Sequence, residues 1–216
     1  MIVNILDTKN SLLNKFILEI RDVVIQKDAM RFRRNIERIG EILAYELSKS
    51  LNYEHKIVTT PLGTKTVHIP KNDIVLCSIL RAGLPLHTGL LNYFDDAENA
   101  FISAYRKHVN DTEFEIKVEY FASPNLEGKT LILADPMLAT GQSIVSVFEG
   151  LKKHGTPKEI YLACVIGSTQ AIDFIKKHFP STTKLWIATV DSELNNKGYI
   201  IPGLGDAGDL AFGEKL

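Results

Sequence analysis

Residues 132–143 read ILADPMLATGQS, an apolar run that passes through a single acid into a turn of small residues. The apolar run predicts a buried strand. Apolar residues then recur at steps of three and four over 143–154, which predicts an amphipathic helix. A strand, a short turn and a helix form the repeating unit of α/β proteins, so this stretch predicts the fold class.

The same pattern recurs along much of the chain. β-rich apolar runs lie at 74–80, 100–105, 130–134, 160–167 and 184–190, and helical patterns lie between several of them, at 84–93, 143–154 and 170–179. Strands that are buried on both faces read as near-continuous apolar runs. We therefore predict a mostly parallel sheet flanked by helices.

Two segments differ from this pattern. An amphipathic pattern over 28–51 predicts a long helix within an N-terminal helical segment, residues 1–55, and its apolar face needs a partner surface. Residues 114–120 alternate apolar and charged side chains, which is typical of a half-exposed antiparallel strand. We call the surrounding residues 107–128 the hood, which is either a mobile cover or a plain edge strand. We expect a single domain over 1–216.

The composition is that of an ordinary globular protein. The chain has 216 residues, 45% of them hydrophobic and 24% charged, with a net charge of −1, which gives no support for a nucleic-acid partner. No apolar run approaches the ~18 residues of a membrane span, and we expect a cytoplasmic protein without a membrane partner. Cys77 and Cys164 lie inside apolar runs and are expected to be core thiols. The six histidines have no ligand-like spacing, so a metal is expected to arrive with a ligand.

The turn Thr140-Gly141-Gln142-Ser143 is a candidate phosphate site. It precedes a helix, whose first N–H groups lack intrahelical partners and lie at the positive end of the helix dipole. Gly141 permits a close backbone approach, and Asp135 can accept hydrogen bonds from a vicinal diol such as a ribose. The alternative is that Thr140 or Ser143 caps the helix and Asp135 begins a turn.

Two arginines follow strands and are candidate anion ligands. Arg81 precedes Ala-Gly, which leaves room for its fork of donors to turn toward a diphosphate, and the alternative is a surface ion pair. Arg106 is a second candidate clamp, or part of a solvated loop. The chain has no P-loop motif. The formal G-x-G-x-x-G at 203–208 lies too close to the C-terminus for a dinucleotide site and predicts an irregular loop that faces a small planar ligand.

Three segments together resemble the uracil phosphoribosyltransferase family. They are RAGL at 81–84, DPMLATGQS at 135–143 and GYIIPGLGDAGD at 198–209, and the resemblance extends from Arg21 to Gly213. It implies a type I phosphoribosyltransferase fold with an N-terminal helical arm and a β-rich hood. It also implies a reaction in which uracil and 5-phosphoribosyl 1-pyrophosphate (PRPP) give UMP and pyrophosphate, with Mg²⁺ as cofactor and a homodimer or higher homo-oligomer as the assembly.

The resemblance implies roles for individual residues. Arg81 and Arg106 would contact the pyrophosphate, Ile200 and the backbone of Gly205, Asp206 and Ala207 would pair with uracil, and Asp206 would also hold the Mg-pyrophosphate group. Arg81 and Asp206 are the residues we expect to act in catalysis. The residues expected to cradle the ribose 5-phosphate are Asp135, Pro136, Met137, Leu138, Ala139, Thr140, Gly141, Gln142 and Ser143.

The chain departs from the family pattern at several places. Gln142 stands where glycine is usual, Leu210 where arginine is usual, and residues 168–171 read STQA in place of APEG. The hood matches poorly, which leaves open whether GTP is an effector. Two alternatives to the enzyme are a regulatory protein on the same fold that senses a nucleotide or PRPP, or binds RNA, without efficient catalysis, and a related transferase for another base, which the PGLGDAGD string disfavours.

Overall fold

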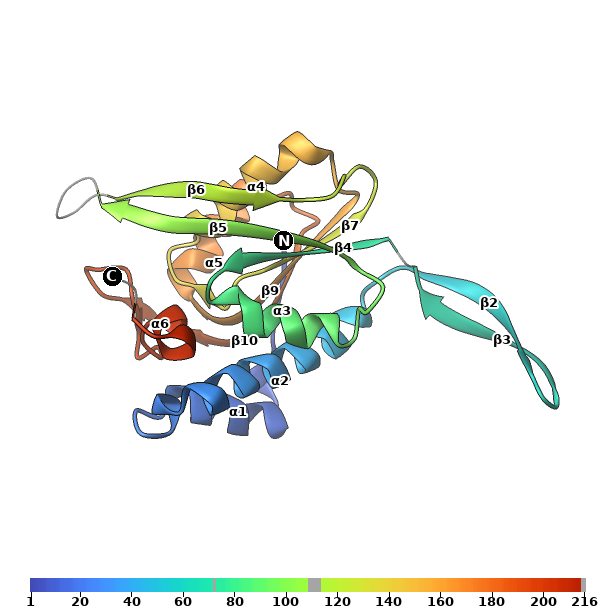
Figure 1. Ribbon diagram of the computed structural model, residues 1–216, viewed down its shortest axis with the longest axis horizontal. Helices are drawn as coiled ribbons and strands as arrows, with labels where there is room; N and C mark the ends of the chain where they lie inside the picture. Colours follow the sequence, from blue (N-terminus) through green and yellow to red (C-terminus); the bar gives the residue numbers. More distant parts are fainter. Residues whose placement is uncertain (72, 109–113, 215–216) are drawn as a thin grey trace.

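The computed structural model describes residues 1–71, 73–108 and 114–214, and the side chains of residues 104–119 lie outside this description. Its centre is an eight-stranded sheet in the order β1-β10-β9-β7-β4-β5-β6, with β8 paired to β9 (Figure 1). The strands are β1 Ile2–Ile5, β4 Ile74–Leu80, β5 Glu98–His108, β6 Phe114–Ala122, β7 Thr130–Ala134, β8 Met137–Leu138, β9 Glu159–Ser168 and β10 Lys184–Asp191.

All the pairings in this sheet are parallel except that of β5 with β6. The predicted parallel sheet and the predicted antiparallel strand at 114–120 are therefore confirmed. The mobility of the hood and the single-domain boundary stay predictions. Residues 109–113 of the hood lie outside the described part of the chain.

Helices cover both faces of the sheet (Figure 1). One apolar layer contains side chains of α1, α2, α3 and α6, and the other contains side chains of α4 and α5. The bounds are α1 Leu12–Arg21, α2 Ala29–Ser48, α3 Gly83–Leu91, α4 Gln142–Leu151, α5 Thr169–His178 and α6 Ala207–Phe212, with short 3₁₀ turns at Leu6–Thr8, Ile25–Lys27 and Lys152–His154.

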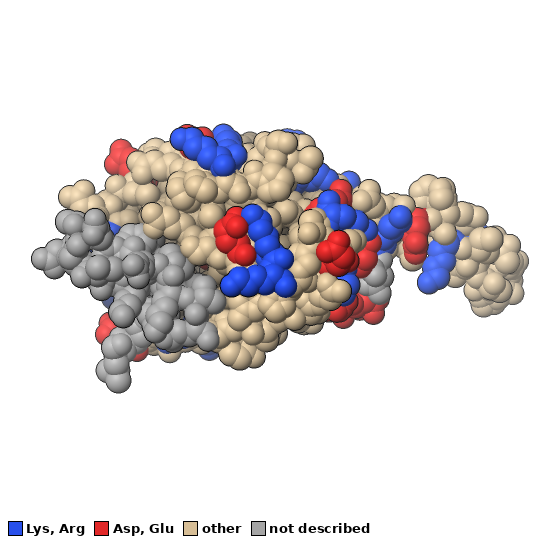
Figure 2. All heavy atoms as spheres, turned by 90° about the horizontal axis from the view of Figure 1, so that it is seen from above, with Lys and Arg blue, Asp and Glu red and all other residues tan. Residues whose placement is uncertain are grey.

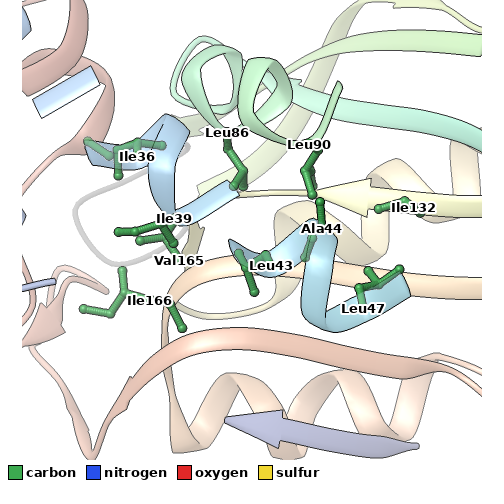
Figure 3. Close-up of a cluster of buried hydrophobic side chains, with 14 of the residues drawn as sticks. Ile36, Ile39, Leu43, Ala44, Leu47, Leu86, Leu90, Ile132, Val165 and Ile166 are labelled. Carbon is green, nitrogen blue, oxygen red and sulfur yellow. The ribbon is translucent and has the colours of Figure 1, made fainter. Parts of the chain in front are cut away.

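The apolar face of α2 finds its partner surface within the chain. Figure 3 shows Leu43 and Leu47 of α2 beside Leu90 of α3 and Ile132 of β7. The predicted amphipathic pattern is thus confirmed. The same packing means that this face is not available to a second copy, so it gives no argument for a dimer.

The helices α2 and α3 approach each other closely because both carry glycine at their crossing. A Cβ atom at Gly89 would lie 2.0 Å from the carbonyl oxygen of Glu37, and one at Gly40 would lie 2.8 Å from that of Leu86. No real Cβ atom fits at 2.0 Å from a backbone oxygen, so these two helices can only pack at this distance with glycine at position 89.

Several elements were not predicted. The N-terminal segment 1–55 is not wholly helical, because β1 pairs with β10 at the edge of the sheet. The strands β2 Tyr53–Thr60 and β3 Gly63–Pro70 form a two-stranded ribbon that projects from the body (Figure 1). A second small pairing joins β11 Glu193–Leu194 to β12 Ile200–Ile201. None of the described helices is long and apolar enough to cross a membrane.

Substitution of Gly89 by alanine tests the helix crossing. We expect Gly89→Ala to lower the free energy of unfolding by about 1–3 kcal/mol, because α3 must move away from α2 and its side chains must repack. Urea unfolding at a fixed pH measures the change. Thr88→Ala, on the exposed side of the same helix, is the matched control and should stay within about 0.5 kcal/mol of the unchanged protein. Equal effects of the two substitutions would contradict the close approach.

Candidate functional site

The strand order reverses direction between β4 and β7. From β4 the chain passes through α3 to β5 on one side, and from β7 it passes through α4, β9 and α5 to β10 on the other. Open parallel sheets bind their ligands at such a point, beyond the carboxyl ends of the strands. Arg81 follows β4 and Asp135 follows β7, so both predicted residues stand at the reversal.

The turn before α4 leaves the start of that helix open. Gly141 is the N-cap residue in the left-handed conformation, with φ of +79°, and makes no side-chain cap bond. Thr140 Oγ1 accepts a long hydrogen bond from the N–H of Gln142 at 3.4 Å, so the alternative in which Thr140 caps the helix is confirmed in part. Helix starts of this kind can bind anions through their first N–H groups, and a phosphate at this turn stays a prediction.

Asp135 lies at the base of this turn. It is 9% exposed, and its Oδ1 accepts a hydrogen bond from the N–H of Met137 at 3.1 Å, so it does begin a turn as the alternative predicts. It also lines a shallow hollow at the start of α4, and its binding of a vicinal diol stays a prediction. The hollow is lined by Asp135, Met137, Leu138, Ala139, Thr140, Gly141, Ser143 and Ile144. Of the predicted loop, buried Pro136 and exposed Gln142 are not part of this lining.

Arg81 joins the strand β4 to the C-terminal segment. Its Nη2 donates to Asp209 Oδ1 at 2.8 Å and to the carbonyl oxygen of Gly213 at 3.1 Å, and its side chain is 41% exposed. The ion pair that was the alternative interpretation is therefore present. Because its partner belongs to the predicted uracil segment, the pair brings the two predicted regions together.

The C-terminal segment is more regular than predicted. Instead of an irregular loop throughout 203–208, the chain turns at Gly203 and enters α6, with Asp206 as the N-cap. Asp206 Oδ1 accepts from the N–H groups of Gly208 and Asp209 at 2.9 and 3.0 Å. A hollow of about 260 Å³ is lined here by Gln26, Leu204, Gly205, Asp206, Asp209, Leu210 and Glu214.

Two residues fix the backbone that leads into this segment. Ile200 is buried in the core, which fixes the position of its main chain. Gly203 has φ of +62°, and a Cβ atom there would lie 2.1 Å from the carbonyl oxygen of Ile200. Only glycine allows this fold-back.

Sequence reasoning missed a brace between α1 and the end of β10. Arg21 donates through two nitrogens to the two carboxylate oxygens of Asp191, each at 2.8 Å, and also to the carbonyl oxygen of Gly203 at 3.1 Å. Asp191 in turn accepts from the N–H of Gly203 at 2.9 Å. The brace fixes the start of the C-terminal segment from both sides. Its only sequence signal is an acid directly after a strand, the same signal that drew attention to Asp135.

The electrostatics of Asp191 follow from these contacts. Burial would raise the pKa of its carboxyl group, but the hydrogen bonds from Arg21 and Gly203 and the charge of Arg21 outweigh burial and lower the pKa below its ordinary value. Asp191 is therefore held as the carboxylate.

A buried polar chain lies beneath the Arg81 loop and was also missed. Ser78 of β4 contacts Nδ1 of His87 at 2.8 Å, and Nε2 of His87 contacts Asn99 Oδ1 of β5 at 2.9 Å. Because the amide oxygen can only accept, Nε2 carries the proton and Ser78 donates to Nδ1. Burial lowers the pKa of His87, against the opposing hydrogen bond to Asn99, so the ring is neutral.

The two cysteines are buried and free, as predicted. Burial raises the pKa of the Cys77 thiol to about 12, and burial together with the charge of Asp135 raises that of Cys164 well above its ordinary value. Neither thiol can serve as a nucleophile near neutral pH. The side chain of Arg106, in β5, lies outside the described residues.

Charge on the molecular surface is mixed. Figure 2 shows basic side chains beside acidic ones on the described part of one face. Ion pairs elsewhere in the described structure, such as Lys129 with Glu98 and Lys158 with Asp73, likewise join opposite charges. The described surface in this view offers no continuous basic stripe of the kind that nucleic acid requires.

The fold and the site define a class. The chain is a mostly parallel α/β protein with a glycine turn at the start of a helix and a second, glycine-rich segment at the same end of the sheet. Proteins that bind phosphorylated small molecules place their ligands in this way.

Comparison with known proteins identifies the family. The family model described as uracil phosphoribosyltransferase matches residues 8–214. A uracil phosphoribosyltransferase of Porphyromonas gingivalis is 53% identical over 211 residues, which cover 98% of each chain. One from Pyrococcus furiosus is 38% identical over 205 residues, 94% of this chain and 86% of its own. The solved structure of the AQ2163 protein from Aquifex aeolicus superposes with a TM-score of 0.87 at 31% identity, covering 98% of both chains. The chain belongs to the uracil phosphoribosyltransferase family.

Acid should weaken the brace between Arg21 and Asp191. The pKa of Asp191 is lower in the folded chain than in the unfolded one. The carboxylate therefore stabilises the fold at any pH above about 3.9, the ordinary pKa of an aspartate side chain. This stability is lost as the pH falls through the lower pKa of the folded chain. We expect Asp191→Asn to cost roughly 2 kcal/mol at pH 7, and the difference from the unchanged protein to shrink below pH ~4. Thermal unfolding at both pH values measures this.

Asp173→Asn is the control for general charge effects, because Asp173 forms an exposed pair with Lys176 on α5. It should change stability little at either pH. A difference between Asp191→Asn and the unchanged protein that persists undiminished in acid would contradict the brace.

Proposed function

We propose that this chain transfers a phosphoribosyl group from PRPP to uracil, giving UMP and pyrophosphate. The observation that carries the proposal is the meeting of two features at one end of the sheet. The start of α4, where the N-cap residue is a glycine, would offer N–H groups to a phosphate, and the segment around Asp206 lies next to Arg81. Membership of the uracil phosphoribosyltransferase family supplies the substrates.

The donor would bind along the loop between β7 and α4. Its 5′-phosphate takes the N–H groups at the start of α4, while Asp135 at the base of the loop accepts hydrogen bonds from the ribose hydroxyls. Arg81 binds the pyrophosphate and, to do so, exchanges its carboxylate partner Asp209 for the ligand, which is feasible because the pair is partly exposed. Arg106 is assigned to the same pyrophosphate by the family resemblance.

Uracil would bind against the backbone of Ile200 and of residues 205–207. The buried side chain of Ile200 and the fold-back at Gly203 hold this backbone in one shape, and a fixed row of main-chain donors and acceptors can match the edge of a flat base. Recognition through the main chain fits the absence of large base-reading side chains at 203–208, which read GLGDAG.

Magnesium fits the donor set without being built into the protein. Among the described residues, no group of three or more His, Cys, Asp or Glu side chains forms a metal site. Mg²⁺ is commonly held by one or two carboxylates together with phosphates and water, and Asp206 and Asp135 supply carboxylates at this end of the sheet. When bound with pyrophosphate, the ion would neutralise the charge of the leaving group.

The chain's own residues act on the reaction by position and charge. As the bond from the ribosyl C1 to pyrophosphate lengthens, positive charge develops at C1 and negative charge at the departing oxygens. Arg81 stabilises the latter, and no covalent intermediate on the protein is needed. The buried neutral thiols agree with this, since neither is a nucleophile.

The projecting β2–β3 ribbon is the structural argument for a homodimer. Ile57 and Leu62 are 73% and 99% exposed, and a two-stranded ribbon by itself is only marginally stable in water. We propose that the ribbon packs on a second copy of the chain. Sedimentation equilibrium at micromolar concentration should give twice the mass of 24.1 kDa, and a monomer would contradict this. A cytoplasmic location and the response to GTP stay predictions of the sequence.

A coupled assay tests the activity. Protein, uracil, PRPP and Mg²⁺ should yield UMP, whereas donor binding with no UMP over hours would favour the regulatory alternative, which no observation on the described residues supports. Asp206→Asn keeps an oxygen to cap α6 but removes the charge, and should lower kcat by ~10²-fold or more. The control is Gln142→Gly at the exposed residue 142, which should leave kcat nearly unchanged. Equal losses in both variants would argue against the assigned role of Asp206.

A further inference from the structure

Ser168 stands where β9 ends and α5 begins, within the STQA segment that departs from the family pattern. Its side chain is fully buried. The hydroxyl accepts a hydrogen bond from the N–H of Ala171 at 2.9 Å, as expected for the N-cap of α5. It also donates to the carbonyl oxygen of Ala139 at 2.7 Å. Helix capping uses only the lone pairs of a hydroxyl, so the second bond is not explained by capping.

Ala139 lies in the middle of the proposed phosphate loop. The residues just before it, Met137 and Leu138, pair with Ile166 and Gly167 of β9. Strand pairing thus holds the start of the loop against β9. The hydrogen bond from the Ser168 hydroxyl to Ala139 follows this pairing, just before the chain turns at Thr140 and Gly141. Beyond this point the loop must direct its N–H groups toward a ligand without further ladder bonds.

The phosphate loop also packs directly against α5, the helix that Ser168 caps. A Cβ atom at Gly141 would lie 3.0 Å from the side chains of Phe174 and Ile175 and 3.3 Å from the carbonyl oxygen of Ala171, so the turn rests directly on α5. The phosphate loop is therefore held by α5 at two places, through the hydroxyl of Ser168 and through the packing of Gly141. A shift of either would change where the N–H groups at the start of α4 point.

We propose that Ser168 is a positioning residue for the donor phosphate, which holds the Ala139 carbonyl so that the amides of the following turn face the ligand. This inference rests on the proposed function and adds a residue that does not touch the substrate. Small displacements in a prearranged site lose much of its binding, because the donors no longer meet the ligand together. One hydrogen bond of this kind contributes on the order of 1 kcal/mol, which corresponds to roughly five- to tenfold in affinity.

The chain offers a matched control for the substitution. Ser11 is the N-cap of α1, a helix of 10 residues like α5, and its hydroxyl accepts from the N–H of Leu13 at 3.2 Å. Ser168→Ala and Ser11→Ala therefore both delete a serine cap, but only the first also removes a bond to the phosphate loop. Ser168→Thr keeps the hydroxyl and serves as the rescue variant.

Calorimetric titration with ribose 5-phosphate measures the affinity of the phosphate loop for a sugar phosphate, and steady-state assays give KM for PRPP and for uracil. We expect Ser168→Ala to weaken ribose 5-phosphate binding and to raise KM for PRPP by about five- to tenfold, with KM for uracil unchanged and with affinity restored in Ser168→Thr. Ser11→Ala should bind like the unchanged protein, although thermal unfolding shows a loss of stability.

The outcomes separate this inference from the proposed function. If the unchanged protein does not bind ribose 5-phosphate, the proposed function itself is wrong. If the unchanged protein binds ribose 5-phosphate, three results would each overturn the positioning role. In the first, Ser168→Ala binds the ligand equally well, and in the second, Ser11→Ala and Ser168→Ala lose the same affinity. In the third, Ser168→Ala raises KM for uracil as much as KM for PRPP. If Ser168→Ala fails to fold, Ser168→Thr is the deciding variant. Full affinity of Ser168→Thr for ribose 5-phosphate would support the role of the hydroxyl. A loss of that affinity in folded Ser168→Thr would overturn it.

Discussion

The site depends on one backbone constraint, the left-handed turn at Gly141. That conformation lets the chain leave the loop after β7 and enter α4 with a glycine at the N-cap position, where we propose that the first N–H groups of the helix bind an anion. The parallel sheet places this turn beside the end of β4, because β4 and β7 are neighbours where the strand order reverses. The fold therefore places the turn at the end of the sheet, and Gly141 leaves the start of α4 without a side chain at the N-cap position.

The second half of the site is joined to the first by charged groups. Arg81 links the end of β4 to Asp209 of α6, and Arg21 with Asp191 fixes the fold-back at Gly203. Both links involve groups at the carboxyl ends of strands. The buried chain of Ser78, His87 and Asn99 lies under the same end of the sheet and satisfies polar groups that would otherwise be costly there. Charged and polar groups from distant parts of the sequence are in this way brought to one end of the sheet.

Much of this could be predicted because it rests on local patterns. The apolar runs predicted the strands to within three residues at either end, and the DPMLATG and PGLGDAGD strings predicted the turns at which we propose the ligands bind. The short strand β1 has no distinctive pattern and is recognisable only through its pairing with β10. The brace of Arg21 with Asp191 joins residues 170 positions apart, and no local pattern reveals such a contact. Ser168 stood out only as a departure from a family string, and its purpose depends on the nearby Ala139 carbonyl.

The central claim is that two bends of the main chain, one at 140–144 and one at 203–207, hold the sugar phosphate and the base at a common site. Amide chemical shifts in nuclear magnetic resonance, followed while ribose 5-phosphate and then uracil are added, test it most directly. The account predicts that the first ligand moves the amides of 140–144 most and that the second moves those of 203–207. Shifts concentrated at the opposite end of the sheet, or no response of 140–144 to the sugar phosphate, would contradict it.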